Sequence, residues 1–295
     1  MANRFAKENC TSILLGGIAG ERLRSLLPPV IKVIQDDKNI GDQIHLILEY
    51  EKNSKWGNLV APRANRFIIV RDIPNSLLYT LETFHSELST FEPQLIVLSG
   101  LHLLEGQLSE YRSNRLQNLH SYILNSNTIP LSVPIHLELA SIGDFSFMKQ
   151  IFLHIIPYIN SLGLNEQELF TLYSSLGGSN YSINQFKEPS IRTVIDTIRF
   201  VLLKLDTKNV TRYLTRVHFH CLHFHVIVEI GAKQQWDGGL NAVAAGSLAA
   251  TFQACDITSI HSIDAYLVDF SFPNNVQTGI FNVSICENYY PINFK

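Results

Sequence analysis

The sequence predicts an α/β fold, in which helices cover a mainly parallel sheet and a small β segment is inserted near the amino end. Short apolar runs, which suit buried strands, alternate with amphipathic runs of about 10–18 residues, which suit helices. The chain has 295 residues, of which 46% are hydrophobic, and can therefore bury a large core in one or two domains. A pair of β-rich runs within residues 43–72 interrupts the alternation.

In the amino-terminal part, glycine and proline set the boundaries of short elements. A strand at 13–15 ends in a Gly-Gly turn, and a helix at 21–27 is stopped by a Pro-Pro pair. Two β-rich runs, 43–50 and 65–71, flank a turn-rich loop and predict antiparallel strands that form a flap or lid. The spacing of leucine and phenylalanine then predicts a helix over 75–91.

From residue 94 onwards strands and helices alternate, as βαβ units do around a parallel sheet. The expected strands are 94–98, 133–139 and 216–230, and the expected helices are 107–124, 145–160, 165–176, 190–205 and 240–252. A polar loop is expected at 177–187, and no helix is placed after Cys255. Because ligands of such sheets bind outside the carboxyl ends of the strands, functional residues should follow strands.

Composition excludes several classes of function. Charged residues make up 17% of the chain and the net charge is −3, and no cluster of Lys and Arg is visible, so we expect no nucleic-acid partner. No uncharged run reaches the ~20 residues that span a bilayer, and the amino end lacks the apolar stretch of a signal peptide. The four cysteines form no CxxC pair and are expected to be buried thiols.

The first candidate site lies in the run PIHLELAS at 134–141. His136 and Glu138 are two residues apart on a predicted strand, so their side chains point to the same face. They also lie at the carboxyl end of the strand, where a site is expected. A carboxylate among apolar residues needs a partner, so a buried ion pair or a helix cap is the alternative to a functional role.

The second candidate is SLGLNEQE at 161–168, where Asn165 and Glu168 are three residues apart at the start of a predicted helix. One interpretation is a capping arrangement, with Asn165 at the N-cap and Glu168 folding back. The other has both residues facing a hydrated Mg²⁺, with phosphate held at the helix N-terminus. Mg²⁺ needs only one or two protein carboxylates, which Glu138 and Glu168 would supply.

The third candidate is RVHFHCLHFH at 216–225, which places four histidines within a short run. On one continuous strand, His218 and His220 would face one side of the sheet and His223 and His225 the other, so a four-ligand cage would need a bulge. A first-row metal site, histidines that line a ligand cleft and ordinary core histidines all remain open.

Together these motifs resemble the ADP-dependent glucokinases, sugar kinases with a ribokinase-like three-layer core, and animal members most of all. The similar stretches fall in the family's order over about residues 2–255: HLILEY at 45–50, WG at 56–57, ANRFI at 64–68, VLSGLHLLEGQ at 97–107, IHLELAS at 135–141, SLGLNEQEL at 161–169, RVHFH at 216–220 and AVAAG at 242–246. The resemblance implies a nucleotide-binding core of residues 1–41 and 73–295, with residues 42–72 forming part of a sugar-binding β lid.

The resemblance also implies an activity and its residues. In this family glucose O6 attacks the β-phosphate of ADP, with Mg²⁺, and gives glucose 6-phosphate and AMP. The residues carried over are the metal-site carboxylates Glu138 and Glu168, Asn165 of the same NxxE motif, Arg66 on the nucleotide phosphates, His45 on the sugar, and His218 and His220 in the nucleotide-side motif. Glucose and ADP are thus the expected partners, and the protein is expected to be a monomer.

The sequence departs from the family pattern in two places. No Gly-x-Gly-Asp occurs, although the family's proton-accepting Asp lies in such a loop, and Asp237 is a poor substitute because it matches another segment. The amino end begins where the family's sugar-binding turn should be ending. The chain is therefore expected to be truncated at both ends, and its identity over residues 256–295 is open.

Three functions remain open. The first is an ADP-dependent glucokinase, the second is a catalytically dead nucleotide- or sugar-binding fragment, and the third is a related kinase that uses fructose 6-phosphate. This chain carries no recognisable targeting segment, and the resemblance suggests the lumen of the endoplasmic reticulum or the secretory pathway, with the cytoplasm as the alternative. Four Asn-x-Ser/Thr sequons, at Asn9, Asn180, Asn209 and Asn282, would matter only there.

Overall fold

The computed structural model describes residues 1–34, 41–62, 65–205, 212–221, 223–230, 236, 239–255, 264–267 and 276–282. The described residues form two compact units, one within Met1–Glu87 and the other within Leu88–Cys286. The division into a core of 1–41 and 73–295 and a lid of 42–72 stays a prediction. None of the helices in these ranges combines the length and apolar character that a membrane crossing requires.

The larger unit is built on a seven-stranded sheet with the order β12-β13-β11-β10-β9-β8-β7. Strands β7 to β10 pair in parallel, whereas β11, β13 and β12 continue the sheet in antiparallel pairs. The strands are β7 (Ile96–Ser99), β8 (Ile135–Glu138), β9 (Ser161–Leu164), β10 (Arg216–His220), β11 (Phe224–Ile230), β12 (Asp264–Leu267) and β13 (Val276–Asn282). The parallel half of the sheet confirms the predicted α/β class.

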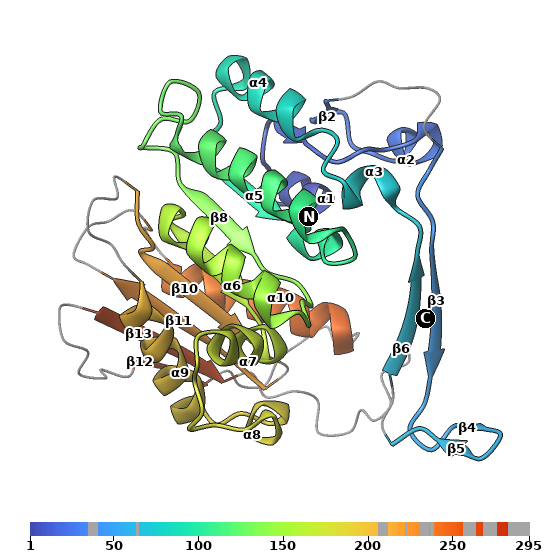
Figure 1. Cartoon of the computed structure of the whole chain (residues 1–295), viewed down its shortest axis with the longest axis vertical. Helices are drawn as coiled ribbons and strands as arrows, with labels where there is room; N and C mark the ends of the chain where they lie inside the picture. Colours follow the sequence, from blue (N-terminus) through green and yellow to red (C-terminus); the bar gives the residue numbers. More distant parts are fainter. Residues whose placement is uncertain are drawn as a thin grey trace. The chain divides into compact units, whose positions relative to one another are not determined.

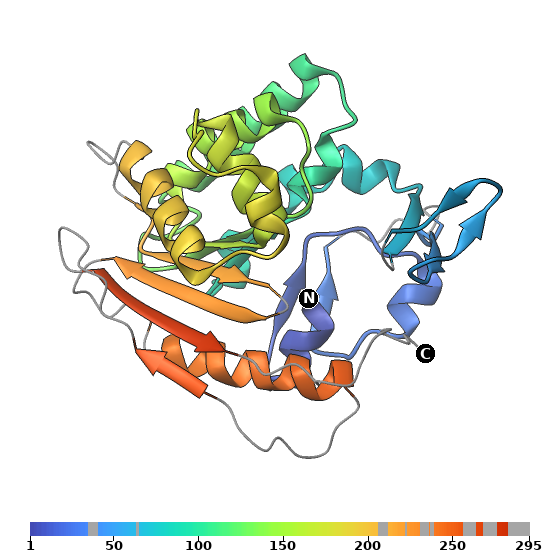
Figure 2. The same cartoon turned by 90° about the horizontal axis from the view of Figure 1, so that it is seen from below.

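Helices lie on both faces of this sheet, which gives three layers (Figures 1 and 2). One face carries four of them: α5 (Ser109–Leu124), α6 (Phe145–His154), α7 (Glu166–Ser175) and α9 (Ile191–Lys204). The other carries α10 (Gly239–Cys255), which packs against β11 and β13. Ile135 and Leu137 of β8, together with Leu162 and Leu164 of β9, are almost fully buried and form the centre of the core.

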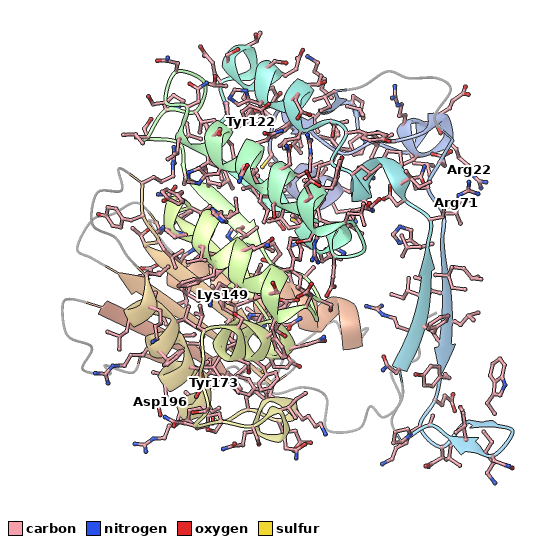
Figure 3. The ribbon with its side chains drawn as sticks, in the orientation of Figure 1. Arg22, Arg71, Tyr122, Lys149, Tyr173 and Asp196 are labelled. Atoms are coloured by element: carbon pink, nitrogen blue, oxygen red, sulfur yellow. The ribbon has the colours of Figure 1, made fainter. Side chains whose placement is uncertain are left out.

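An aromatic cluster joins the helices at one end of this unit. The Tyr173 ring, labelled in Figure 3, contacts Phe200 of α9 and Phe186 of the short helix α8 (Ile183–Lys187) at centroid distances of 4.9 and 6.2 Å. The hydroxyl of Tyr173 accepts a hydrogen bond from the Asn180 amide at 2.8 Å. These contacts order residues 177–187, which the sequence predicted to be a polar loop without a helix.

The smaller unit contains short helices, a parallel strand pair and an extended ribbon. Strands β1 (Ile13–Leu15) and β2 (Ile31–Val33) pair in parallel, whereas β3 (His45–Tyr50) pairs with β6 (Asn65–Val70) in antiparallel register, as predicted. The remaining elements are the two-residue strands β4 (Lys55–Trp56) and β5 (Leu59–Val60), and the helices α1 (Ala2–Lys7), α2 (Glu21–Ser25), α3 (Ile73–Ser76) and α4 (Leu81–Phe91), the last of which continues into the larger unit.

The single helix predicted over 75–91 is wrong, because α3 ends at Ser76 and α4 begins at Leu81. Two features explain the break. The side chain of Asp72 accepts a hydrogen bond from the Asn75 amide and so starts α3 early, and Leu78 has a φ of 50°, which interrupts the helical path.

Candidate active site

The carboxyl ends of β8, β9 and β10 bring the predicted site residues of the larger unit together. Glu138 is the last residue of β8, Asn165 directly follows β9, and His220 is the last residue of β10. Because these three strands are adjacent and parallel, their ends meet at one edge of the sheet. The structure therefore brings these three candidate residues to the same edge of the sheet.

Two histidines hold the carboxylate of Glu138. His136 Nε2 lies 3.1 Å from Glu138 Oε2, and His220 Nε2 lies 3.0 Å from Glu138 Oε1. Burial alone would raise the pKa of Glu138, but these hydrogen bonds and the adjacent imidazoles outweigh it and lower the pKa to about 2. Glu138 is therefore an ionised, acceptor-only group at this edge of the sheet.

A glycine makes room for this arrangement. Gly163 of β9 lies opposite Glu138 in the sheet register, and a Cβ on Gly163 would come within 2.0 Å of Glu138 Oε2 and 3.1 Å of His136 Cε1. A residue with a side chain at 163 would therefore displace the carboxylate, so the sequence SLGL suits both a buried strand and this site.

Asn165 and Glu168 form the capping box that was one of the two predicted arrangements. Asn165 Oδ1 accepts from the Glu168 amide at 3.0 Å, and the carboxylate of Glu168 accepts from the Asn165 backbone N–H and from Asn165 Nδ2, both at 2.9 Å. Burial raises the pKa of Glu168, although the Asn165 amide and the charge of His220 oppose the shift. The charge of Glu138 contributes to the rise.

The four histidines do not lie on one strand. Residues 221–223 separate β10 from β11, and the two strands form an antiparallel hairpin in which His220 pairs with His225. The expected separation of His218 and His220 from His225 on opposite faces is therefore wrong: His218 Nε2 lies 3.1 Å from His225 Nδ1, whereas His223 is exposed. Burial lowers the pKa of His218 to about 3 and that of His225 to about 4, so both rings are neutral.

Two residues near Glu138, Ser161 and Arg216, were not among the site residues predicted from the sequence. Ser161 of β9 and Arg216 of β10 lie beside His136 in the same row of the sheet register. Arg216 is the first residue of the RVHFH motif, which was the only available signal for it. Ser161 is likewise the first residue of the SLGLNEQEL motif, but the strand β9 that orients it was not predicted.

His45 and Arg66 belong to the smaller unit. Paired residues of an antiparallel ribbon share a face, and alternate pairs point the same way, so the pairs His45–Val70, Ile47–Ile68 and Glu49–Arg66 lie on one face. His45 and Arg66 thus face the same side, and both are exposed. Figure 3 shows the side chains of β3 and β6 projecting from both sides of this ribbon. Asp237 lies outside the described residues.

The donors at this edge of the sheet suit Mg²⁺ better than a softer metal. Within the described ranges, no group of three or more His, Cys, Asp and Glu side chains is placed to hold a metal ion. Mg²⁺ does not require such a cage, since it retains waters and takes one or two carboxylates together with phosphate oxygens. Glu138, which is ionised, and Glu168, which follows the adjacent strand, supply carboxylates of the kind that Mg²⁺ takes.

Comparison with known proteins places the chain in a family. The family model of the ADP-specific phosphofructokinase/glucokinase conserved region matches residues 1–288. An ADP-dependent glucokinase of Bos taurus is 37% identical over 282 residues, which are 94% of this chain and 55% of that protein. A probable ADP-dependent glucokinase of Caenorhabditis elegans is 32% identical, over 98% of this chain and 58% of that protein. The chain thus spans somewhat more than half the length of these relatives.

Solved structures agree on the fold. A hypothetical ADP-dependent phosphofructokinase from Pyrococcus horikoshii OT3 superposes with a TM-score of 0.71 at 17% identity, over 99% of this chain and 73% of that one. An ADP-dependent kinase in complex with fructose 6-phosphate and ADPβS gives a TM-score of 0.66 at 15% identity, over 91% of this chain and 69% of that one. At these identities the likeness concerns the fold, and it confirms the ribokinase-like architecture.

Proposed function

The chain belongs to the ADP-specific phosphofructokinase/glucokinase family, and on that premise we propose that it transfers the β-phosphate of ADP to O6 of glucose. The products are glucose 6-phosphate and AMP. Two relatives that match almost the whole chain are named as glucokinases that depend on ADP, which favours glucose as acceptor and ADP as donor.

The observation that carries this proposal is the ionised Glu138 carboxylate at the end of β8, next to the strand β9 that leads into the capping box of Asn165 and Glu168. Glu138 and Glu168 are the proposed magnesium ligands, and bound Mg²⁺ would neutralise negative charge on the diphosphate. Glu138 supplies an oxygen whose ionisation is secured by His136 and His220. Asn165 fixes the rotamer of Glu168 through the two hydrogen bonds that it donates.

The remaining proposed contacts are taken for each unit by itself. In the larger unit, Asn165, His218 and His220 are the proposed nucleotide contacts, and in the smaller unit Arg66 is a proposed phosphate contact. His45 would contact the sugar. Arg66 and His45 suit a shared task because they lie on one face of the ribbon. Catalysis of phosphoryl transfer consists mostly of such positioning and charge neutralisation.

The test is a direct assay of the purified chain with glucose, ADP and Mg²⁺, in which AMP and glucose 6-phosphate are both quantified. We expect product with ADP and much less with ATP. Glu138→Gln and Glu168→Gln should each lower turnover about 10²–10³-fold, since each removes charge stabilisation from the transition state. Glu110→Gln, on the exposed face of α5, is the matched control. Normal turnover in Glu168→Gln would remove Glu168 from the site.

A screen of acceptors separates glucose from fructose 6-phosphate, which the family description also allows. The motifs LNEQE and HLELAS favour glucose. A kcat/KM higher for fructose 6-phosphate than for glucose would assign the chain to the phosphofructokinase branch.

Binding without transfer is the second candidate, and one sequence fact favours it. No Gly-x-Gly-Asp occurs in the 295 residues, and a proton acceptor typically contributes about 10²–10⁴-fold to the rate. Calorimetry with ADP, Mg²⁺ and glucose distinguishes the two candidates. Saturable binding together with absent AMP formation would support a binding protein, whereas turnover would exclude it.

For the cellular setting we propose a monomer in the lumen of the endoplasmic reticulum. Asn9 and Asn180 both start sequons and are exposed, so oligosaccharyltransferase could reach them. A glycosidase-sensitive mass shift that Asn180→Gln reduces would support this compartment, and an unmodified mass in expressing animal cells would argue against it. Light scattering after size exclusion tests the monomer.

A further inference from the structure

A row of hydrogen bonds runs behind Glu138 across three strands of the sheet. Arg216 Nε donates to Ser161 Oγ at 3.0 Å, Ser161 Oγ lies 2.9 Å from His136 Nδ1, and His136 Nε2 lies 3.1 Å from Glu138 Oε2. Arg216, Ser161 and His136 are register partners on β10, β9 and β8, so they point to the same face. The row connects a charged donor at one end with the proposed metal ligand at the other.

We propose that Ser161 and Arg216 are positioning residues, which fix the ring orientation and tautomer of His136 and thereby hold Glu138 in place for a divalent cation. The role of Glu138 in binding a divalent cation rests on the proposed function. The tautomer of His136 does not, because it depends only on the hydrogen bonds of the row. Neither Ser161 nor Arg216 touches a substrate in the proposal. Both act through His136.

The direction of the hydrogen bonds follows from the two ends of the row. An ionised carboxylate only accepts, so His136 must carry its proton on Nε2 in order to donate to Glu138. The Nδ1 atom of a neutral ring is then an acceptor, and the Ser161 hydroxyl must donate to it. Arg216 can only donate, so it occupies a lone pair of Ser161 Oγ and leaves the hydroxyl proton free for His136. Every donor in the row thus points toward Glu138.

The arginine end of the row is rigid. The guanidinium carbon of Arg216 lies 3.9 Å from the centroid of the Trp236 ring, and Trp236 Nε1 donates to Thr215 Oγ1 at 2.9 Å. Ser161 is fully buried. Burial lowers the pKa of Arg216, and the charge of Glu229, its register partner on β11, opposes that shift. A stacked, half-buried arginine keeps Ser161 in one orientation because its planar group has few alternative positions.

The tautomer is tested by long-range ¹H–¹⁵N NMR of histidine-labelled protein at about pH 8, where ordinary imidazoles are neutral. We expect His136, assigned through its loss in His136→Gln, to carry its proton on Nε2. Ser161→Ala should give a mixture of tautomers, and Arg216→Met should shift the ring in the same direction. Ser161→Thr keeps the hydroxyl and should restore the wild-type spectrum. Ser175→Ala removes a hydroxyl that donates to a backbone carbonyl on α7, and it serves as the control.

The functional part is tested by Mn²⁺ binding, followed by electron paramagnetic resonance in the presence of ADP, with thermal unfolding to verify that each variant is folded. Loss of such an outer partner typically weakens metal binding about 10–100-fold, and we expect this for Ser161→Ala but not for Ser161→Thr. A proton on Nδ1 in the wild type, or an unchanged tautomer and unchanged Mn²⁺ affinity in Ser161→Ala, would overturn the inference. If Glu138→Gln binds Mn²⁺ as the wild type does, the proposed metal ligand is wrong, and the NMR result alone then decides the role of Ser161.

Discussion

The ionised state of Glu138 results from the opposing effects of burial and of its two histidine neighbours. Burial raises its pKa, and two histidine hydrogen bonds reverse the shift. The same contacts raise the pKa of His220, although burial by itself lowers it. This arrangement requires Gly163, since any side chain there would occupy the volume of the carboxylate.

Gly163→Ala should therefore impair the site more than the fold. The added methyl group would overlap Glu138 Oε2, so the carboxylate must leave the two histidines, at a cost of about 1–3 kcal/mol in unfolding free energy. Turnover and Mn²⁺ affinity should both fall by at least about 10-fold. Gly106→Ala is the control, because nothing lies within 4 Å of a Cβ at that position. Equal kinetics in the two variants would show that Glu138 need not stay between the histidines.

The His218–His225 pair predicts a loss of stability in mild acid. Both folded-state pKa values, about 3 and about 4, are lower than the ordinary value of 6.5, so the unfolded chain binds more protons between these limits. Stability from this pair is complete above about pH 6.5 and falls as the pH is lowered toward 4, by on the order of 3 kcal/mol for each ring. Urea unfolding at several pH values measures this slope. His225→Gln should make the unfolding free energy depend less steeply on pH. An equal dependence in the variant would show that other groups cause the loss of stability in acid.

Sequence predicted the position of individual site residues better than their partners. Glu138 was placed correctly at the end of a strand and Asn165 at the start of a helix, because period-two alternation and a capping pattern are local signals. The contact of His218 with His225 depends on the antiparallel pairing of β10 with β11, and the sequence between these strands has neither glycine nor proline to indicate it. Capping and metal binding use the same Asn-x-x-Glu spacing, so the pattern could not separate them.

At the scale of elements, Arg212 joins the amino ends of the parallel strands. Its guanidinium donates to Asn160 Oδ1 at 2.9 Å and to the carbonyls of Pro130 at 3.0 Å and of Val133. Asn160 in turn accepts from the Ile135 amide that begins β8 and, through its carbonyl, from the Arg216 amide that begins β10. This buried cluster lies at the opposite end of the strands from Glu138, and it sets the alignment of β8 with β10.

Arg212→Met should destabilise the larger unit by roughly 3 kcal/mol, because it leaves several buried oxygens without their donor while filling a similar volume. Chemical denaturation monitored by circular dichroism measures the change. Arg199→Met, an exposed position on α9, should change unfolding free energy by less than about 0.5 kcal/mol. Similar values for the two variants would mean that Asn160 alone holds the strands.

Two of the missed elements, β9 and α8, were missed because they are short. Strand β9 is four residues that lead directly into α7, and such a run is too short to show a period. Helix α8 is five residues within a polar segment, and it depends on contact of Phe186 with Tyr173. Long amphipathic segments such as α5 and α9 were predicted to within two residues of their ends, because their pattern repeats over several turns.

At the scale of the whole molecule, burial is distributed unevenly. Almost all of the fully buried apolar side chains among the described residues belong to the larger unit, whereas the smaller unit contributes chiefly Ile18, Ala19 and Ile31. All twelve residues of β3 and β6 are exposed, and the face opposite to His45 and Arg66 carries five large apolar side chains: Leu46, Leu48, Tyr50, Phe67 and Ile69. Two isolated strands are only marginally stable in water.

The two units should therefore differ in the free energy of the structural openings that allow their backbone amides to exchange hydrogen. In native-state hydrogen exchange followed by mass spectrometry, amides of β3 and β6 should exchange through local openings that cost little, while those of β8 to β10 should exchange near the cost of global unfolding. Leu164→Ala, which empties a buried position on β9, should lower protection in β8 to β10 by about 2–5 kcal/mol and leave β3 and β6 unchanged. Protection of β3 and β6 that matches β8 to β10, and falls with it in Leu164→Ala, would show that the chain unfolds as one cooperative body. In that case burial within the smaller unit would not account for the stability of β3 and β6, because all of their residues are exposed.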